Sequence, residues 1–255
     1  MVKDPPVREI LIPSQGPEDW RRVLAEPDKH WRRRYSAKAL AYCWESARDF
    51  PPSVRRVFSA SPFTVFHKIE MLIGIVEHRV PLPGRGYPSQ TDLFVLAKSE
   101  GDLVSIAVEG KVSEPFDDLV SDWLARPARA KASDGDVPLE APQPSTPSPA
   151  KLTRLAGLCR MLELDEEDVK SVRYQLVHRT AAALIEAERF NARHALMLVH
   201  SFNQKEPPDS FDDYECFAAL LRTKVEKDAI AHVGKRDGVE LYLGWVIGEA
   251  EFLSV

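Results

Sequence analysis

Two carboxylates and an amine lie near each other in the middle of the sequence, on segments that we expect to be adjacent strands. Asp92 is near the start of an apolar run, 91–97, and Glu109 and Lys111 lie near the end of a second run, 103–112. Turn-forming residues precede the first run and separate it from the second, which is typical of a β-hairpin. Since alternate side chains of a strand face opposite sides, Glu109 and Lys111 would share one face, and the hairpin would bring Asp92 close to Glu109.

Carboxylates next to an ammonium group are suited to the hydrolysis of a phosphodiester. Asp92 and Glu109 offer the hard oxygen ligands that Mg²⁺ or Mn²⁺ prefers. Such an ion lowers the pKa of bound water and stabilises negative charge on phosphoryl oxygens. Lys111 would place an ammonium group beside that water and the scissile phosphate. One alternative stays open, because the same three residues would also make a structural ion-pair group on a sheet edge.

These residues also resemble a known motif. Asp92 followed by Glu109-Gly110-Lys111 is similar to the core of the PD-(D/E)xK nuclease superfamily, the fold of type II restriction endonucleases, although Thr91 stands where the motif name has proline. Most of the chain from about Trp31 onward also resembles a bacterial family of restriction-endonuclease-like proteins without an assigned substrate, through the segments EHRVPLPG, SQTDLFVLA, SIAVEGKVSEPF, YQLVHRTAAALIEA and HALMLVHSF. The resemblance implies an α/β fold with a restriction-endonuclease-like mixed β-sheet flanked by helices and an N-terminal helical extension.

The resemblance implies further site residues. An additional acid upstream of the aspartate often joins the metal site in that superfamily, and Glu77 is the candidate here, with Glu70 in reserve. A glutamine on the helix after the E-x-K strand would match Gln175, and His178 and Arg179 are candidates for phosphate contacts. For each of these the alternative is an ordinary structural or surface role. The predicted catalytic residues are Asp92, Glu109, Lys111 and Gln175, and the predicted metal ligands are Asp92, Glu109 and Glu77.

The function implied by the resemblance is that of a nuclease. It would be a metal-dependent phosphodiester hydrolase using Mg²⁺ or Mn²⁺, acting on DNA in preference to RNA, in bacterial defence or DNA processing. The competing interpretation is a non-catalytic interaction module that retains the nuclease fold. The net charge of −5 does not indicate nucleic-acid binding by itself, although basic residues crowd the segment 21–38. The expected partners are nucleic acid and, where the chain self-associates, a second copy in a homodimer; no membrane partner is expected.

Composition and missing motifs exclude several other classes. The 255 residues are 44% hydrophobic and 29% charged, which is ordinary for a globular protein. No apolar run reaches the length of a membrane span and the N-terminus lacks a secretory signal, so we expect a cytoplasmic protein. Cys43, Cys159 and Cys216 are isolated, which argues for reduced thiols and against a zinc site. Neither GxxxxGK[ST] nor GxSxG occurs, which argues against a phosphate-binding loop and a serine nucleophile.

The sequence predicts two parts, a helical region at 1–60 packed on the core and a restriction-endonuclease-like core at 61–255. In the first part, helices are expected from Pro17, over 36–48 with Ser36 as the cap, and from Pro51-Pro52. A proline-rich segment, 132–150, is predicted to be a mobile insertion. The aromatic residues expected to pack in the core are Trp20, Trp31, Tyr35 and Trp44. The core strands are predicted at 69–80, 91–97, 103–112, 194–202 and 239–247, and the core helices at 117–126, 152–164, 165–190 and 212–224.

Overall fold

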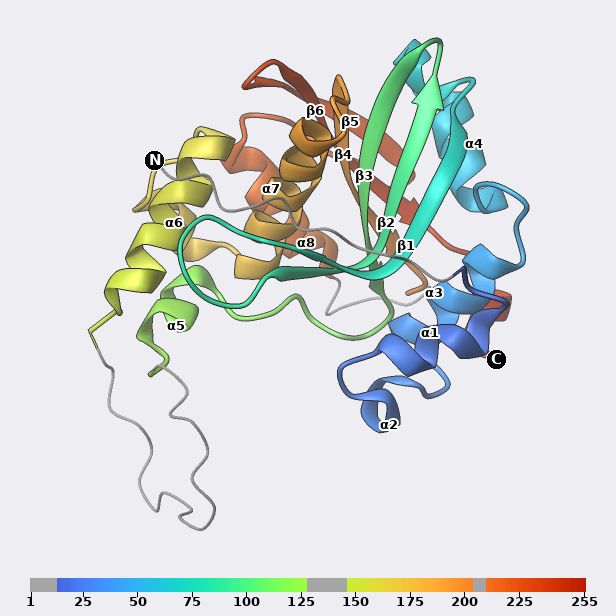
Figure 1. Ribbon diagram of the computed structural model, residues 1–255, viewed down its shortest axis with the longest axis horizontal. Coiled ribbons are helices and arrows are strands. Elements are labelled where there is room, and N and C mark those ends of the chain that lie inside the picture. The colour runs from blue at the N-terminus through green and yellow to red at the C-terminus, as the bar shows by residue number, and fades with distance from the viewer. Residues whose placement is uncertain (1–12, 128–145, 204–209) are drawn as a thin grey trace.

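A six-stranded mixed sheet with helices on both faces forms the centre of the fold (Figure 1). The computed structural model describes residues 13–127, 146–203 and 210–255. The sheet order is β1-β2-β3-β4-β6-β5; the pairs β3–β4 and β4–β6 are parallel and the remaining pairs are antiparallel. The predicted α/β class, a mixed sheet flanked by helices with a helical N-terminal region, is confirmed. The strands are β1 (Glu70–Val80), β2 (Ser89–Ser99), β3 (Asp102–Lys111), β4 (His194–Ser201), β5 (Ala229–Arg236) and β6 (Val239–Ile247).

The meander of β1, β2 and β3 has the register that the hairpin interpretation requires. Leu93 of β2 pairs with Val108 of β3 and with Val76 of β1. The next position along each strand is Asp92, Glu109 and Glu77, so these three acids occupy the same level of adjacent strands. Because they lie toward the ends of β1 and β3, polar side chains can gather there without breaking the apolar middle of the sheet.

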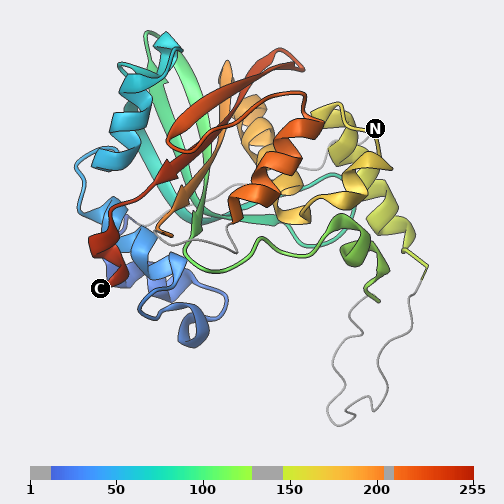
Figure 2. The same cartoon turned by 180° about the vertical axis from the view of Figure 1, so that it is seen from behind.

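The side chains of β4 point alternately into two apolar clusters, which shows how the sheet separates two layers of helices. Ala195 and Met197 belong to one apolar cluster, and Leu196 and Leu198 to the other. A strand covered on both faces needs a continuous apolar run, which is the pattern of this segment. The layer on the face of Ala195 and Met197 contains α5 (Val120–Ala125), α6 (Pro149–Leu162), the short η2 (Asp168–Ser171), α7 (Tyr174–Arg189) and α8 (Ser210–Leu220). Figure 2 shows this layer from the side opposite to the view of Figure 1.

The second layer is built mainly from the N-terminal region. Its elements are α1 (Pro17–Val23), α2 (Pro27–His30), α3 (Ser36–Glu45), α4 (Pro52–Ala60), η1 (Thr64–Phe66) and η3 (Ala250–Leu253). Trp20 and Trp44 are buried there, as predicted, whereas Trp31 and Tyr35 are only half-buried. Ser36 is the first residue of α3 and not its N-cap. Its backbone N–H donates a hydrogen bond to the side chain of Glu114, which is distant in the chain. The helix also ends at Glu45, before the predicted 48.

The long helix predicted over 165–190 is interrupted. It is divided into η2 and α7 by extended residues at 172–173. Tertiary hydrogen bonds cause the break: Val120 N–H donates to Val172 O, and Tyr174 N–H donates to Asp118 O. This local pairing overrides the helical preference of the sequence. Its consequence for the site is that Gln175 lies in the first turn of α7.

Other boundaries also differ from the sequence prediction. The sequence analysis missed β5, although Asp237-Gly238 between β5 and β6 is a two-residue hairpin signal and both residues have positive φ. The helix predicted from 152 begins at Pro149, where the Ser148 side chain accepts the Lys151 N–H. Of the predicted insertion, 132–150, residues 132–145 lie outside the described residues. In the described part of the chain, every helix is too short or too polar to span a bilayer.

Candidate active site

The end of β3 carries the hydrogen-bonded centre of the site. Lys111 Nζ donates to Glu109 Oε1 at 3.0 Å and to Gln175 Oε1 at 3.0 Å. Gln175 Nε2 closes the triangle by donating to Glu109 Oε1 at 2.7 Å. Glu109 and Lys111 are only 2% and 5% exposed, so the triangle is shielded from bulk water. Three of the four predicted catalytic side chains are therefore in direct contact.

Asp92, the fourth predicted catalytic residue, contacts β3 through a hydrogen bond to the backbone. Its Oδ2 accepts the N–H of Gly110 at 2.8 Å. A Cβ at Gly110 would lie 3.4 Å from that same Oδ2 and 3.3 Å from Leu40 Cδ2, which is tighter than ordinary contact. A glycine between Glu109 and Lys111 thus allows α3 to pack closely against the strand that carries the site. Sequence analysis gave Gly110 no role, because its neighbours are distant in the chain.

Glu77 enters from β1 in an unusual backbone conformation. Its φ is +52°, which costs a non-glycine residue about 1–2 kcal/mol. Gln90 Nε2 donates to Glu77 Oε2 at 2.5 Å, and both side chains line the cavity that Asp92 and Glu109 also line. Backbone strain at such a point is typical of functional sites. The reserve candidate, Glu70, is exposed and pairs with Lys98 at the other end of β1, so it cannot share an ion with Asp92.

Arg179 is the second cation of the site, and its partners differ from those expected. Its Nε donates to Glu109 Oε2 at 2.6 Å, and its Nη1 donates to Ser89 Oγ at 2.8 Å. Sequence analysis named Arg179 only as a phosphate contact. The i, i+4 spacing from Gln175 on one helix could have placed both side chains on the same carboxylate. His178 does not line the cavity: it is buried against Ser89, and burial holds its pKa well below the usual value.

The carboxyl groups have opposite electrostatic environments. Burial raises the pKa of Asp92 well above its usual range, and the nearby Glu109 and Glu77 raise it further. Burial likewise raises the pKa of Glu77 to about 7. Burial also opposes ionisation of Glu109, but Lys111 and Arg179 outweigh it and its pKa lies below the usual value. Glu109 is thus a fixed anion, whereas its two neighbours resist ionisation until positive charge arrives.

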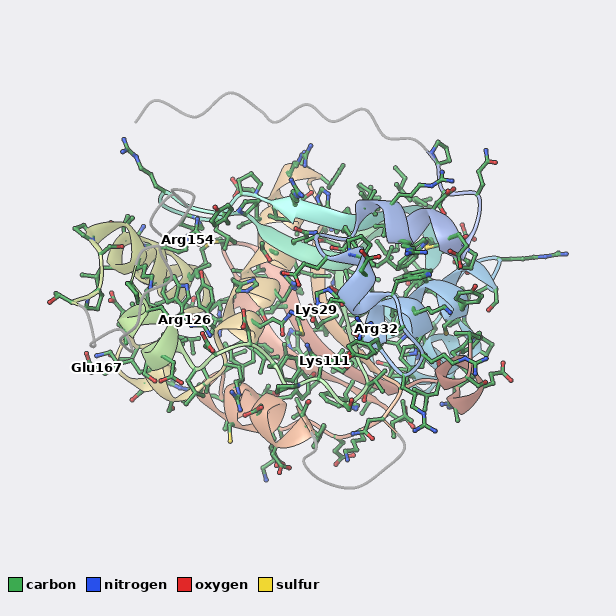
Figure 3. The ribbon with its side chains drawn as sticks, turned by 90° about the horizontal axis from the view of Figure 1, so that it is seen from below. Lys29, Arg32, Lys111, Arg126, Arg154 and Glu167 are labelled. Atoms are coloured by element: carbon green, nitrogen blue, oxygen red, sulfur yellow. The ribbon has the colours of Figure 1, made fainter. Side chains whose placement is uncertain are left out.

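A cavity of about 500 Å³ opens above these side chains. One wall contains Glu77, Asp92, Glu109, Gln175 and Arg179, and the opposite wall comes from the N-terminal layer. Lys29 and His30 at the end of α2 and Tyr35 before α3 belong to the second wall. Figure 3 views this end of the molecule, with Lys111 near the middle and Lys29 and Arg32 beside it in projection.

A bidentate carboxylate fastens the second wall to β3. Glu114 Oε1 accepts the N–H of Ser36 at 2.8 Å, and its Oε2 accepts the N–H of Val112 at 2.8 Å. One side chain therefore ties the start of α3 to the end of the active-site strand. No local pattern in the sequence identifies this clamp, because Ser36 is far from Glu114 in the chain.

The comparisons with known proteins identify a family but no individual similar protein. A family described as "Domain of unknown function (DUF6946)" matches residues 13–250. The chain belongs to the DUF6946 family. Searches of curated proteins and of solved structures return no match.

The side chains of the DUF6946 site fit a hard divalent cation. Asp92, Glu109 and Glu77 supply carboxylate oxygens, the ligand type that Mg²⁺ and Mn²⁺ prefer. When all three are ionised, Lys111 and Arg179 leave one negative charge uncompensated. A bound cation would remove the mutual repulsion that raises the pKa of Asp92.

A second group of ligand-type side chains lies at the other face of the sheet. Within the described residues, Cys43, His200 and Glu249 form the group whose ligand atoms all lie within 4.8 Å of one another; the acids of the cavity are spread more widely. Sequence analysis expected no cysteine–histidine cluster, because Cys43 and His200 are far apart in the chain. Both residues are fully buried.

Proposed function

We propose that this DUF6946 protein is a metal-dependent phosphodiesterase that cuts nucleic acid, DNA in preference to RNA. The observation that carries the proposal is the contact of Lys111 Nζ with the buried anion Glu109, on a strand whose neighbour brings Asp92 to the same cavity. The strand-borne Asp, Glu and Lys are also the pattern of the PD-(D/E)xK nucleases that the sequence resembles. Bacterial defence or DNA processing is the setting that this resemblance implies.

Asp92, Glu109 and Glu77 would hold a Mg²⁺ or Mn²⁺ ion, which would supply an acidified water and stabilise charge on the phosphate. Lys111 would orient the attacking water and would stabilise the anionic transition state from the strand end. Gln175 holds Lys111 and Glu109 together, since its amide bonds both. Arg179 keeps Glu109 ionised and is a positioning residue in the absence of substrate.

A cleavage screen tests the proposal. Purified protein is incubated with single- and double-stranded DNA and RNA, with Mg²⁺, Mn²⁺ or EDTA. Metal-dependent cleavage is expected for wild type and is expected to be lost in Lys111→Ala and Asp92→Asn. Lys98→Ala is the matched control, because Lys98 is an exposed lysine on β2 of the same hairpin.

Two results would decide against the nuclease. If no substrate is cut and no metal binding depends on Asp92, the proposal is wrong. If metal binds through Asp92 without any cleavage, the non-catalytic interaction module with a retained fold is the better account.

A further inference from the structure

The second wall of the cavity restricts what can reach the acids. The cavity measures about 500 Å³, within the roughly 300–1,000 Å³ of pockets that enclose one small ligand. That space suits one nucleotide unit and not a double helix. Residues of α2 and of the segment leading into α3 stand opposite Asp92 and Glu109, so the acids are approached through this cavity.

The α3 side of this wall is anchored to the folded core, whereas α2 buries no residue. The Glu114 clamp joins Ser36 to Val112 through two hydrogen bonds of 2.8 Å. Leu40 of α3 is fully buried and lies against the Gly110 position of β3. A duplex that displaced the wall would have to break these contacts, with the loss of both hydrogen bonds and of buried apolar surface.

The chemistry of the wall complements a nucleotide. Tyr35 supplies a half-buried aromatic ring, and base–aromatic stacking is worth about 1–3 kcal/mol per base. Lys29 supplies an exposed ammonium group whose ion pair with Glu26, at 3.1 Å, is a surface pair that a phosphate can replace. Cation and ring thus face the acids across a space of nucleotide size.

From these features we propose that the protein acts on single-stranded nucleic acid, with one nucleotide unit inserted between the two walls. Tyr35 stacks on the base and Lys29 contacts the phosphate backbone, while Asp92, Glu109 and Lys111 face the scissile phosphate. The inference rests on the proposed function and adds the form of the substrate. The wall recognises base and phosphate, which DNA and RNA strands share. Binding to DNA and to RNA is therefore measured separately, to show which of the two the protein prefers.

The test measures binding without cleavage. In the Asp92→Asn background, fluorescence anisotropy compares short single strands of DNA and RNA with a blunt duplex of the same sequence. At least one single strand is expected to bind ten-fold or more tightly than the duplex. Adding Tyr35→Ala is expected to weaken that binding about 5- to 150-fold, the range of one lost stack, while Tyr35→Phe retains it.

A salt titration tests the phosphate contact separately. Adding Lys29→Ala is expected to reduce the slope of log K against log salt by about 0.7, the value for one phosphate on a single strand. Thermal unfolding of each variant shows whether the wall remains folded, and Tyr35→Phe keeps the test valid if Tyr35→Ala is unstable.

Several outcomes would overturn the inference. These are duplex binding as tight as single-strand binding, no binding to any strand, or unchanged binding in a folded Tyr35→Ala variant. Metal-dependent cutting of duplexes with no preference for single strands would overturn only this inference, whereas absence of all cutting would count against the nuclease itself.

Discussion

Within the described residues, two polar clusters lie on opposite faces of the sheet, and they are organised in opposite ways. At the cavity, burial raises the pKa of Asp92, and the negative charges of Glu109 and Glu77 raise it further. At the other cluster, Cys43, Ser53, His200 and Glu249 satisfy one another. Trp44 Nε1 donates to His200 Nδ1 at 3.1 Å, which leaves the proton of the neutral ring on Nε2, facing Ser53 Oγ at 3.2 Å.

The second cluster ends on Glu249, which caps α4. Ser53 Oγ–H donates to Glu249 Oε2 at 3.0 Å, and the Ser53 backbone N–H donates to Oε1 at 2.7 Å. Burial lowers the pKa of His200 to about 4 and raises that of the Cys43 thiol, so both stay neutral. A closed chain of donors and acceptors needs no ion, although its residue types are those of a transition-metal site. Both clusters contain metal-ligand residue types, and the proposed site differs in its unrelieved like charge beside an open cavity.

Removing the Lys111 amine, which lies behind Glu109 and Gln175 of the cavity wall, should have the largest effect. Lys111→Ala is expected to lower metal-dependent cleavage by about 10²–10³-fold, because a charge aimed at the transition state is lost. Single-turnover cleavage rates measure it, with Lys98→Ala expected to match wild type. A loss of less than about three-fold in Lys111→Ala would contradict the assigned role of the amine.

Breaking the closed cluster should affect stability and leave chemistry alone. Glu249→Ala is expected to lower the free energy of unfolding by about 2 kcal/mol, since Ser53 N–H and Oγ–H lose their acceptor. Urea denaturation gives the value, and Glu251→Ala, at an exposed glutamate of η3, is the control. If instead Glu249→Ala abolished metal-dependent cleavage while remaining folded, the two clusters would have been assigned the wrong way round.

Neutralising Glu77 should reveal, through pH, the cost of ionising a buried carboxyl group. Its pKa is about 7 in the folded protein, above its ordinary 4.5, so the folded state holds the proton more tightly than the unfolded state. Stability of the metal-free wild type is therefore expected to fall as pH rises from about 4.5 to 7. Glu77→Gln keeps an oxygen acceptor for Gln90 and removes this loss, so above pH 7 it is expected to be more stable than wild type by about 1–3 kcal/mol.

The pH series has a matched control on the same strand. Glu70→Gln changes an exposed glutamate of β1 and controls for the exchange of a strand glutamate for glutamine. A stability difference for Glu77→Gln that does not grow with pH would mean that ionising Glu77 costs no more in the folded protein than in the unfolded one.

The smallest effect concerns how closely α3 approaches the site. Gly110→Ala would place a methyl group 3.3–3.4 Å from Leu40, Ser36 and Asp92. A loss of about 1 kcal/mol in stability is expected, with a reduced cleavage rate, because Asp92 must shift. Thermal unfolding and cleavage rates measure both. Gly74→Ala on exposed β1, where the nearest atom is 3.6 Å away, is the control expected to leave the cleavage rate unchanged.

The part of the site that the sequence could predict is the part that is local. Asp92, Glu109 and Lys111 lie on a tight hairpin, so alternation and turn residues were sufficient to bring them together. Gln175 was placed by the resemblance, and helical spacing could have added Arg179 as a partner of Glu109. The fold class followed similarly, because the buried run of β4 and the meander are strong patterns.

The rest depends on contacts between distant segments. Three features join residues that are far apart in the chain: the Glu114 clamp, the second wall of the cavity and the Cys43–His200–Glu249 group. Patterns in a single sequence do not predict such contacts. The break between η2 and α7 has the same origin, since Asp118 and Val120 compete for the backbone of 172–174. Glu77 likewise has a positive φ that its residue type does not predict.

A Mn²⁺ titration followed by electron paramagnetic resonance tests the central claim most directly, because the signal of free Mn²⁺ disappears on binding. Wild type is expected to bind Mn²⁺ at the cavity, Asp92→Asn to lose that binding, and Cys43→Ser to retain it. Binding that survives in Asp92→Asn but is lost in Cys43→Ser, or no binding to wild type, would contradict the account.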